Sequence, residues 1–183
     1  MRCSWAVENE VLRKYHDLEW GVPVHDDATH FQMITLEGAQ AGLSWLTVLQ
    51  KRENYRNLFK NFDPNEISRM SDKDLECCLL DAGIVRNRLK VYSVRKNASV
   101  FLEMQKEFGT FNAYIWSFTN GKQLLVKHED KSAGKEIYEP VSKELKQRGM
   151  SFVGPTIIQS YLLAIGVLNG HEKGCYRRGE CRK

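Results

Sequence analysis

The sequence predicts an all-α protein. Its 183 residues include only four prolines, and the apolar residues recur in long runs with the 3.6-residue period of helices that bury one face. Residues that cap helices well precede several of these runs. A chain of this length forms one domain or two small lobes, and it can bury enough surface to fold without a disulfide scaffold.

In the first two thirds of the chain, a capping residue followed by an apolar run marks most of the expected helices. These are a helix capped by Asp26 or Asp27, a helix that follows a break at 42–44 and is capped by Ser44, a helix started by a capping box at Ser71–Asp74, a helix from about Arg86 to Glu107, and a short helix over Phe111–Trp116. The tight turn at 81–85 joins the third helix to the fourth, so we expect those two to form a hairpin.

The last third of the chain begins with polar residues. We expect a surface loop at 120–136, a helix at 142–148, and an apolar helix at 157–168 that Gly154-Pro155 opens and Asn169-Gly170 ends. Because the last helix is apolar on most faces, we expect it to cross the core. The short basic tail after Cys175 is expected to be disordered.

Charge and cysteine content narrow the possible classes of function. The formal net charge of +4 is compatible with a polyanionic partner but does not require one. The N-terminus lacks the apolar segment of a secretory signal, and no apolar run approaches the length of a membrane span. We therefore expect a cytoplasmic protein that does not enter membranes and whose five cysteines are reduced. Adjacent Cys77 and Cys78 lie in an apolar helical run and are expected in the core.

One cysteine and one histidine near each end of the chain form a candidate metal site. His171 and Cys175 are spaced by about one helical turn, whereas Cys3 and His16 are too far apart in sequence to be a local pair. Structural zinc is held by four Cys or His ligands in a tetrahedron. Spacing alone leaves two interpretations open: a zinc site that joins the two ends, or buried thiols beside hydrogen-bonded histidines. Cys181 is an alternative ligand to Cys175.

The turn between the two hairpin helices is a candidate phosphate site. Gly83 can adopt a positive φ angle, and the free backbone N–H groups at the start of the next helix suit an anion. Arg86, Arg88 and Lys90 lie at that helix N-terminus, where cations oppose the helix dipole. A bound phosphate would remove this conflict. The alternative is an ordinary helical hairpin with a solvated basic face.

A carboxylate and several aromatic residues form a third candidate site. Glu37 lies among glycines and alanines, which leave room around it, and its burial would be costly without a partner. Tyr15, Trp5, Trp20 and Trp45 are near these groups in sequence, and tryptophan faces stack on bases and attract cations. The alternatives are that Glu37 pairs with a protein arginine or caps a backbone, and that the aromatic residues belong to the core.

Taken together, these segments resemble one known family. The matching stretches are Tyr15–Pro23, Leu36–Trp45, Lys51–Arg56, Asp81–Ile84, Trp116–Phe118 and Phe152–Gly154. They are similar to DNA-3-methyladenine glycosylase I, a family of the helix-hairpin-helix glycosylase superfamily. The resemblance covers nearly the whole chain, and the combination is far more specific than any single stretch.

The resemblance implies a helix-hairpin-helix glycosylase fold that acts as a single catalytic unit over residues 1–183. A central part at roughly 27–118 contains the hairpin, and one structural zinc ion joins the segments 1–26 and 119–183. The implied activity is flipping of 3-methyladenine out of double-stranded DNA and hydrolysis of its N-glycosidic bond, without strand cleavage. The alternatives are a zinc hydrolase and a noncatalytic zinc-containing DNA-binding module. We expect a monomer.

The resemblance also implies roles for individual residues. It makes Glu37 and Tyr15 catalytic, places Trp5, Trp20 and Trp45 against the base, gives DNA contacts to Gly42, Leu43, Gly83, Arg86 and Arg88, and makes zinc ligands of Cys3, His16, His171 and Cys175. Gly42 and Leu43 would enter the duplex where the base has left. Leu12 departs from the family pattern, which has a tyrosine there, so one wall of the pocket and its selectivity differ.

Overall fold

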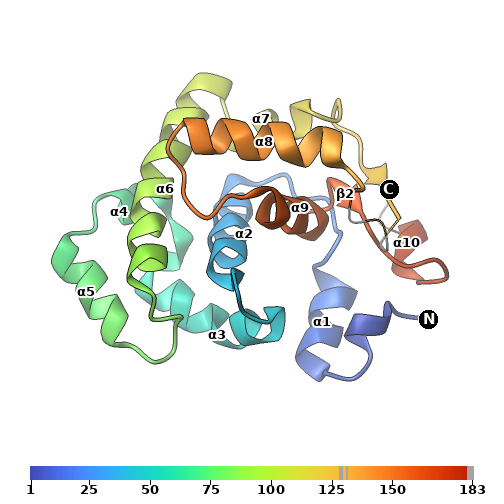
Figure 1. The fold of residues 1–183 in the computed structure, drawn as a ribbon, viewed down its shortest axis with the longest axis horizontal. Coiled ribbons are helices and arrows are strands. Elements are labelled where there is room, and N and C mark those ends of the chain that lie inside the picture. Colours follow the sequence, from blue (N-terminus) through green and yellow to red (C-terminus); the bar gives the residue numbers. More distant parts are fainter. Residues whose placement is uncertain (128–129, 131, 181–183) are drawn as a thin grey trace.

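The computed structural model describes residues 1–127, 130 and 132–180, and this part of the chain is mainly helical (Figure 1). The elements are η1 (Ser4–Ala6), α1 (Glu10–Leu18), α2 (Asp27–Gln40), α3 (Trp45–Leu58), η2 (Lys60–Phe62), α4 (Pro64–Ser68), α5 (Asp72–Leu80), α6 (Arg88–Phe108), α7 (Phe111–Ser117), β1 (Leu124–Leu125), α8 (Lys135–Gln147), α9 (Pro155–Ala164), β2 (Leu168–Asn169) and α10 (Arg177–Glu180). The all-α prediction is confirmed, with one two-residue parallel strand pair added. No helix in the described ranges is long and apolar enough to cross a membrane.

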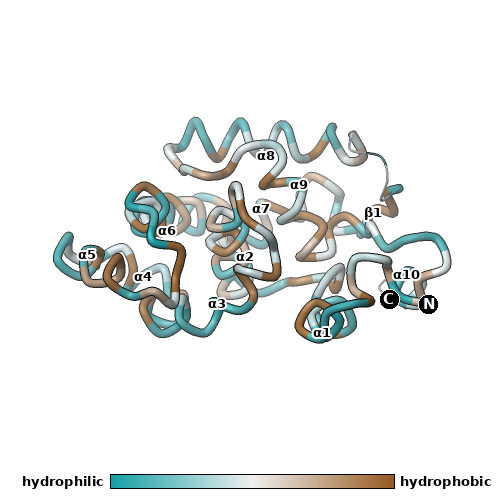
Figure 2. Tube along the Cα trace, turned by 60° about the horizontal axis from the view of Figure 1, so that its bottom comes forward, coloured by the Kyte–Doolittle hydropathy of each residue, from teal (hydrophilic) through white to brown (hydrophobic). Residues whose placement is uncertain are grey.

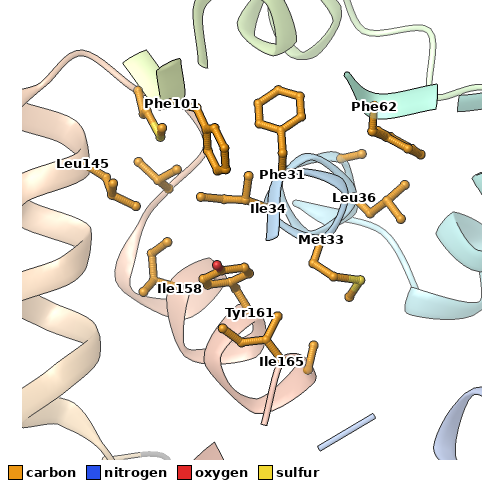
Figure 3. Packing of buried hydrophobic residues seen from close by; sticks show 14 of the residues in the cluster. Phe31, Met33, Ile34, Leu36, Phe62, Phe101, Leu145, Ile158, Tyr161 and Ile165 are labelled. Carbon is orange, nitrogen blue, oxygen red and sulfur yellow. The ribbon is translucent and has the colours of Figure 1, made fainter. Parts of the chain in front are cut away.

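Helix α2 lies at the centre of the core. Phe31, Ile34 and Leu36 are buried on it, and Figure 3 shows its side chains extending in several directions toward the surrounding elements. The Phe31 ring lies 5.1 Å from that of Phe101 on α6. Tyr161, a buried residue of α9, belongs to the same cluster of side chains in Figure 3. Truncating one such side chain to alanine costs roughly 2–5 kcal/mol. The position of α2, which carries Glu37, is therefore strongly fixed.

The predicted helix starts in the first two thirds agree closely with the structure. Asp26 accepts a hydrogen bond of 2.8 Å from the Thr29 N–H, and Ser44 caps α3 by accepting from Thr47. Ser71 and Asp74 form the predicted capping box. Helix α6 begins at Arg88, two residues later than expected, because the Asn87 side chain caps it. These starts were predictable because each cap acts within a few residues.

Helix α1 was not predicted. Asn9 caps it by accepting hydrogen bonds from Val11 and Leu12. Val11, Tyr15 and Leu18 recur at helical spacing, so the sequence contains an apolar stripe and a cap there that the prediction did not use.

The last third of the chain departs most from expectation. Helix α8 begins at Lys135 rather than 142, and its hydrophilic outward turns are visible in Figure 2. Helix α9 ends at Ala164 rather than 168, because Gly166 takes a φ of +74° and the following residues extend into β2. Strand β1, which pairs with β2, lies inside the stretch expected to be a loop.

The N-terminus lies beside the segment that leads into α10. The Tyr176 N–H donates to the Met1 carbonyl at 3.0 Å. Residues 177–180 form α10, so the prediction of a disordered tail is wrong for them. Cys181 lies outside the described residues. Cys78 is buried as expected, but Cys77 is exposed because it points away from the face of α5 that packs on the core.

Candidate functional site

Four side chains from the two ends of the chain meet in a buried Cys₂His₂ cluster: Cys3, His16, His171 and Cys175. His171 Nδ1 lies 3.6 Å from the sulfur of Cys3 and 3.6 Å from that of Cys175. His16 Nε2 lies 3.4 Å from the Cys175 sulfur. The ligand atoms all lie within 4.8 Å of one another, so the structure brings together the predicted metal ligands.

The spacing of these atoms fits a tetrahedral metal ion. Metal–ligand bonds of about 2.0–2.3 Å give tetrahedron edges of roughly 3.3–3.8 Å. The three nitrogen–sulfur distances of 3.4, 3.6 and 3.6 Å fall within this range. Burial and nearby His16 lower the pKa of His171 to about 4, so its ring is neutral and offers a lone pair. Burial raises the pKa of the Cys3 thiol to about 12, and a cation is what would favour its thiolate. Four protein ligands complete the tetrahedron.

Groups around the cluster orient its ligands. Burial alone would raise the pKa of Asp17, but hydrogen bonds with His16, Tyr176 and Arg2 outweigh it and lower this pKa to about 2. The ionised carboxylate accepts a hydrogen bond of 2.9 Å from His16 Nδ1. This leaves His16 Nε2 as the atom facing the cluster. The Glu172 N–H donates to the Cys3 sulfur at 3.3 Å.

Aromatic rings connect the cluster to a neighbouring cavity. The Trp20 ring lies 4.6 Å from that of His171 and 5.0 Å from that of Trp5. The Tyr15 ring follows, 5.4 Å from that of Trp45 at the start of α3. The cluster therefore holds η1 and α1 in place, and with them one wall of the cavity.

We call this cavity the base pocket. It has a volume of about 400 Å³, within the range of small-ligand sites. It is lined by Trp5, Leu12, Tyr15, Trp20, Glu37, Gln40, Ser44, Trp45, Leu46, Ser160 and Leu163. All five predicted catalytic and base-binding residues belong to this lining, and Leu12 forms part of the wall as expected.

Three buried polar atoms around the base pocket have no hydrogen-bond partner among the described residues: Glu37 Oε2, the Tyr15 hydroxyl and Trp45 Nε1. Glu37 is 3% exposed, and burial raises its pKa to about 8. Burial, and then the charge of Glu37, raise the pKa of Tyr15, so its hydroxyl keeps its proton. Buried polar groups are normally paired. A ligand that offers hydrogen bonds or positive charge would satisfy these groups.

The loop between α2 and α3, residues 41–44, lies next to the base pocket. Gly42 has a φ of +79° with open space around it, and Leu43 is 42% exposed. Ser44 and Trp45, which follow directly, line the pocket. An apolar side chain therefore extends into solvent beside the pocket, where the sequence predicts entry into the duplex.

The hairpin turn, residues 81–87, is held by α3. Lys51 donates to the Ala82 carbonyl at 2.6 Å, and the Tyr55 hydroxyl accepts from the Val85 N–H at 3.2 Å. Gly83 does not have the positive φ that the sequence suggested. It is a glycine for another reason: an added Cβ would lie 2.3 Å from Asn54 Nδ2.

The basic residues after the turn separate into three roles. Arg86 is exposed. Arg88 contacts Glu76 on α5 at 2.6 Å, an ion pair that offsets the dipole conflict. Lys90 turns inward and is 8% exposed. It therefore does not form a basic surface with Arg86 and Arg88, although its place in the sequence suggested that it would.

Sequence reasoning missed the contribution of α9 to the base pocket. Ser160 and Leu163 line it from that helix, whose apolar pattern indicated only a core element. Gln40 was also missed, although it lies one helical turn after Glu37, a spacing that places both on one face of α2.

Solved structures of DNA glycosylases share this helical arrangement, and they indicate the class to which the protein belongs. One structure, of a 3-methyladenine DNA glycosylase I, matches with a TM-score of 0.88 and 40% sequence identity and covers 96% of this chain and 98% of that chain. Another, of a variant 3-methyladenine DNA glycosylase I in complex with 3-methyladenine, matches with a TM-score of 0.90 and 32% identity over 97% of each chain.

The chain belongs to the methyladenine glycosylase family. The model of that family matches residues 5–178. DNA-3-methyladenine glycosylase 1 of Escherichia coli (strain K12) is 42% identical over 177 residues, which are 95% of each chain. The resemblance inferred from the sequence is thereby confirmed.

Proposed function

We propose that the protein excises 3-methyladenine from alkylated double-stranded DNA as a monofunctional glycosylase. It releases the free base and leaves an abasic site in an uncut strand. The observation that carries the proposal is Glu37, a buried carboxylate with an oxygen that lacks a partner, inside an aromatic cavity. Two relatives that are 40% and 42% identical are named DNA-3-methyladenine glycosylase. A 32% identical 3-methyladenine DNA glycosylase I has been solved in complex with 3-methyladenine.

The chemistry of the substrate explains why this pocket is sufficient. Methylation at N3 gives the adenine a positive charge, so the base leaves as a neutral molecule and the glycosidic bond is weak. Water adds to C1′ as the bond from C1′ to N9 breaks, the bonding electron pair neutralises the base, and a water proton passes to solvent. Such a leaving group reduces the need for a strong general base. Asp17, the carboxylate next to His16, is engaged with that ring and is not assigned this role.

The base pocket recognises the flipped base through charge and stacking. Ionised Glu37 accepts hydrogen bonds from the base edge and attracts its positive charge. Protonated Tyr15 donates a hydrogen bond, while Trp45, Trp5 and Trp20 provide stacking faces, worth about 1–3 kcal/mol per stacked base. Leu12 makes one wall apolar. Normal bases lack the charge that offsets the burial of the Glu37 carboxylate, so they are disfavoured.

DNA is held on the side that carries the 41–44 loop and the hairpin turn. Taking a base out of the stack costs a few kcal/mol, least for a damaged base. Leu43 fills the gap that the base leaves, and Gly42 allows the loop to turn there. The N–H groups at the start of α6, together with Arg86 and Arg88, hold the backbone phosphates. The N–H groups of Gly83 and Val85 are engaged by Asp81 and Tyr55, so they shape the turn instead.

We assign zinc to the Cys₂His₂ cluster, because two thiolates and two imidazoles form a typical structural zinc set. Cys3, His16, His171 and Cys175 would hold it. When bound, the ion supplies fixed ligand geometry, and a complete ligand set leaves no position for a substrate water. Its contribution is to hold η1 and α1 against the segment after β2.

The protein acts as a single catalytic unit and a monomer, because the base pocket takes its lining from both the central part and the terminal segments of one chain. Since its substrate is genomic DNA, we place it in the cytoplasm.

The deciding experiment measures release of free 3-methyladenine from methylated duplex DNA, with release of 7-methylguanine measured beside it. We expect release of 3-methyladenine, and much slower release from Glu37→Gln. No release of either base by the wild-type protein would exclude the enzyme and favour a noncatalytic DNA-binding module. Release that survives metal removal while the fold persists would exclude a zinc hydrolase.

A further inference from the structure

A buried lysine links the hairpin to the loop beside the base pocket. Lys90 lies in the first turn of α6, three residues after Asn87, which caps that helix. Its ammonium group donates to the Ala39 carbonyl at 2.9 Å and to the Ala41 carbonyl at 2.6 Å. These carbonyls belong to the C-terminal end of α2, where a helix leaves its last carbonyl groups free and favours a cation.

The two carbonyls lie on either side of the point where the chain leaves α2. Ala39 is in the last helical turn, whereas Ala41 is already non-helical with a ψ of 113°. One ammonium group bound to both therefore fixes the direction in which the loop departs. Gly42 and exposed Leu43 follow immediately, and Glu37 lies one turn before.

A lysine is a costly choice for helix capping alone. Burial disfavours the charged ammonium, and an apolar side chain of similar length would fill the same space without that cost. The position also matters, because Lys90 is one helical turn from the hairpin turn, which α3 holds independently through Lys51 and Tyr55. The side chain thus spans the distance between the two DNA-facing segments.

We propose that Lys90 is a positioning residue for base excision: it fixes the spacing between the hairpin turn and the 41–44 loop. With that spacing fixed, Leu43 enters the duplex at the nucleotide whose neighbouring phosphates the hairpin holds. The inference rests on the proposed function. It assigns Lys90 no contact with the base and no contact with phosphate.

The test compares Lys90→Met, Lys90→Gln and Lys90→Arg with a matched control, Lys106→Met, at an exposed position on the same helix. Three quantities are measured for each: the thermal midpoint, the affinity for free 3-methyladenine, and the single-turnover excision rate from duplex DNA. Fluorescence of 2-aminopurine placed beside the lesion reports loss of stacking as the base flips.

We expect Lys90→Met to bind the free base within about threefold of wild type and to excise it roughly 10- to 100-fold more slowly, the effect of losing hydrogen bonds from a charged donor. The 2-aminopurine signal should fall with the excision rate, Lys90→Arg should recover part of both, and Lys106→Met should match wild type. Lys90→Gln, which keeps one donor, gives the same comparison if Lys90→Met does not fold.

Two results would overturn the inference. One is excision within threefold of wild type in a folded Lys90→Met or Lys90→Gln protein. The other is a parallel loss of free-base affinity and excision, which would mean that Lys90 only maintains the base pocket. Neither result resembles failure of the proposed function itself, in which the wild-type protein would release no 3-methyladenine.

Discussion

Glu37→Gln is expected to stabilise the protein while it greatly slows base release. The pKa of Glu37 is raised from 4.5 to about 8 because burial penalises its charge. Between those two values the unfolded chain releases this proton and the folded protein keeps it, so the free energy of unfolding falls as pH rises from 4.5 to 8. The neutral glutamine has no such dependence.

The size of the effect follows from that shift. At pH 7 the wild-type protein is roughly 2.5 pH units above the unfolded pKa of Glu37, which corresponds to about 3 kcal/mol. For a chain of this length, such a difference raises the thermal midpoint by roughly 6–12 °C. Near pH 4.5 the variant and the wild-type protein should have similar stability.

Denaturant unfolding and calorimetry from pH 4.5 to 8.5 measure this difference, with Glu103→Gln, at an exposed position on α6, as control. The same samples are assayed for excision, where the wild-type kcat/KM should rise with pH until Glu37 is ionised. Equal stabilities of Glu37→Gln and wild type at pH 7 would refute the argument. So would a gap between them that does not narrow at low pH.

Four further outcomes are expected. Cys175→Ser should abolish stoichiometric zinc binding, measured by elemental analysis, and lower the thermal midpoint, with weaker binding of 3-methyladenine because the Trp20 wall loosens. Trp45→Ala should weaken that binding roughly 5- to 150-fold in calorimetric titration, the loss of one stacking face; unchanged affinity would place the base elsewhere. Leu43→Ala should leave stability within about 0.5 kcal/mol of wild type, since the residue is exposed, but slow excision from duplex DNA more than from single strands. Arg86→Ala should reduce the slope of log affinity against log salt concentration by about 1, the change expected for one lost phosphate contact. An unchanged slope would show that Arg86 does not contact DNA.

Local signals predicted much of the first two thirds of the fold. Asp26, Ser44 and Ser71 cap helices through hydrogen bonds within their own segments, so the sequence alone contains the information. Helix α1 was missed although local signals mark it, namely the Asn9 cap and the apolar residues Val11, Tyr15 and Leu18 at helical spacing. The strand pair was missed because β1 depends on a partner that is distant in sequence.

The site was predictable where residue chemistry alone restricts the environment. A glutamate among small residues indicated a space that needs a ligand, and Glu37 does line the base pocket. The metal ligands needed the family resemblance, because Cys3 and His16 acquire their spacing only in the folded chain. The inward orientation of Lys90 was beyond reach, since its charge and its place after the turn suggested a surface position.

The metal cluster also has a consequence for the order of biosynthesis. Its outermost ligands, Cys3 and Cys175, lie 172 positions apart, so a bound ion would close a loop of that length, a constraint on the unfolded chain of roughly 5 kcal/mol by analogy with a disulfide of that span. The last ligand, Cys175, leaves the ribosome long after Cys3 and His16. An ion could therefore join the two segments only after residue 175 has been made, and a chain terminated before that residue would lack the closure that sets the aromatic wall.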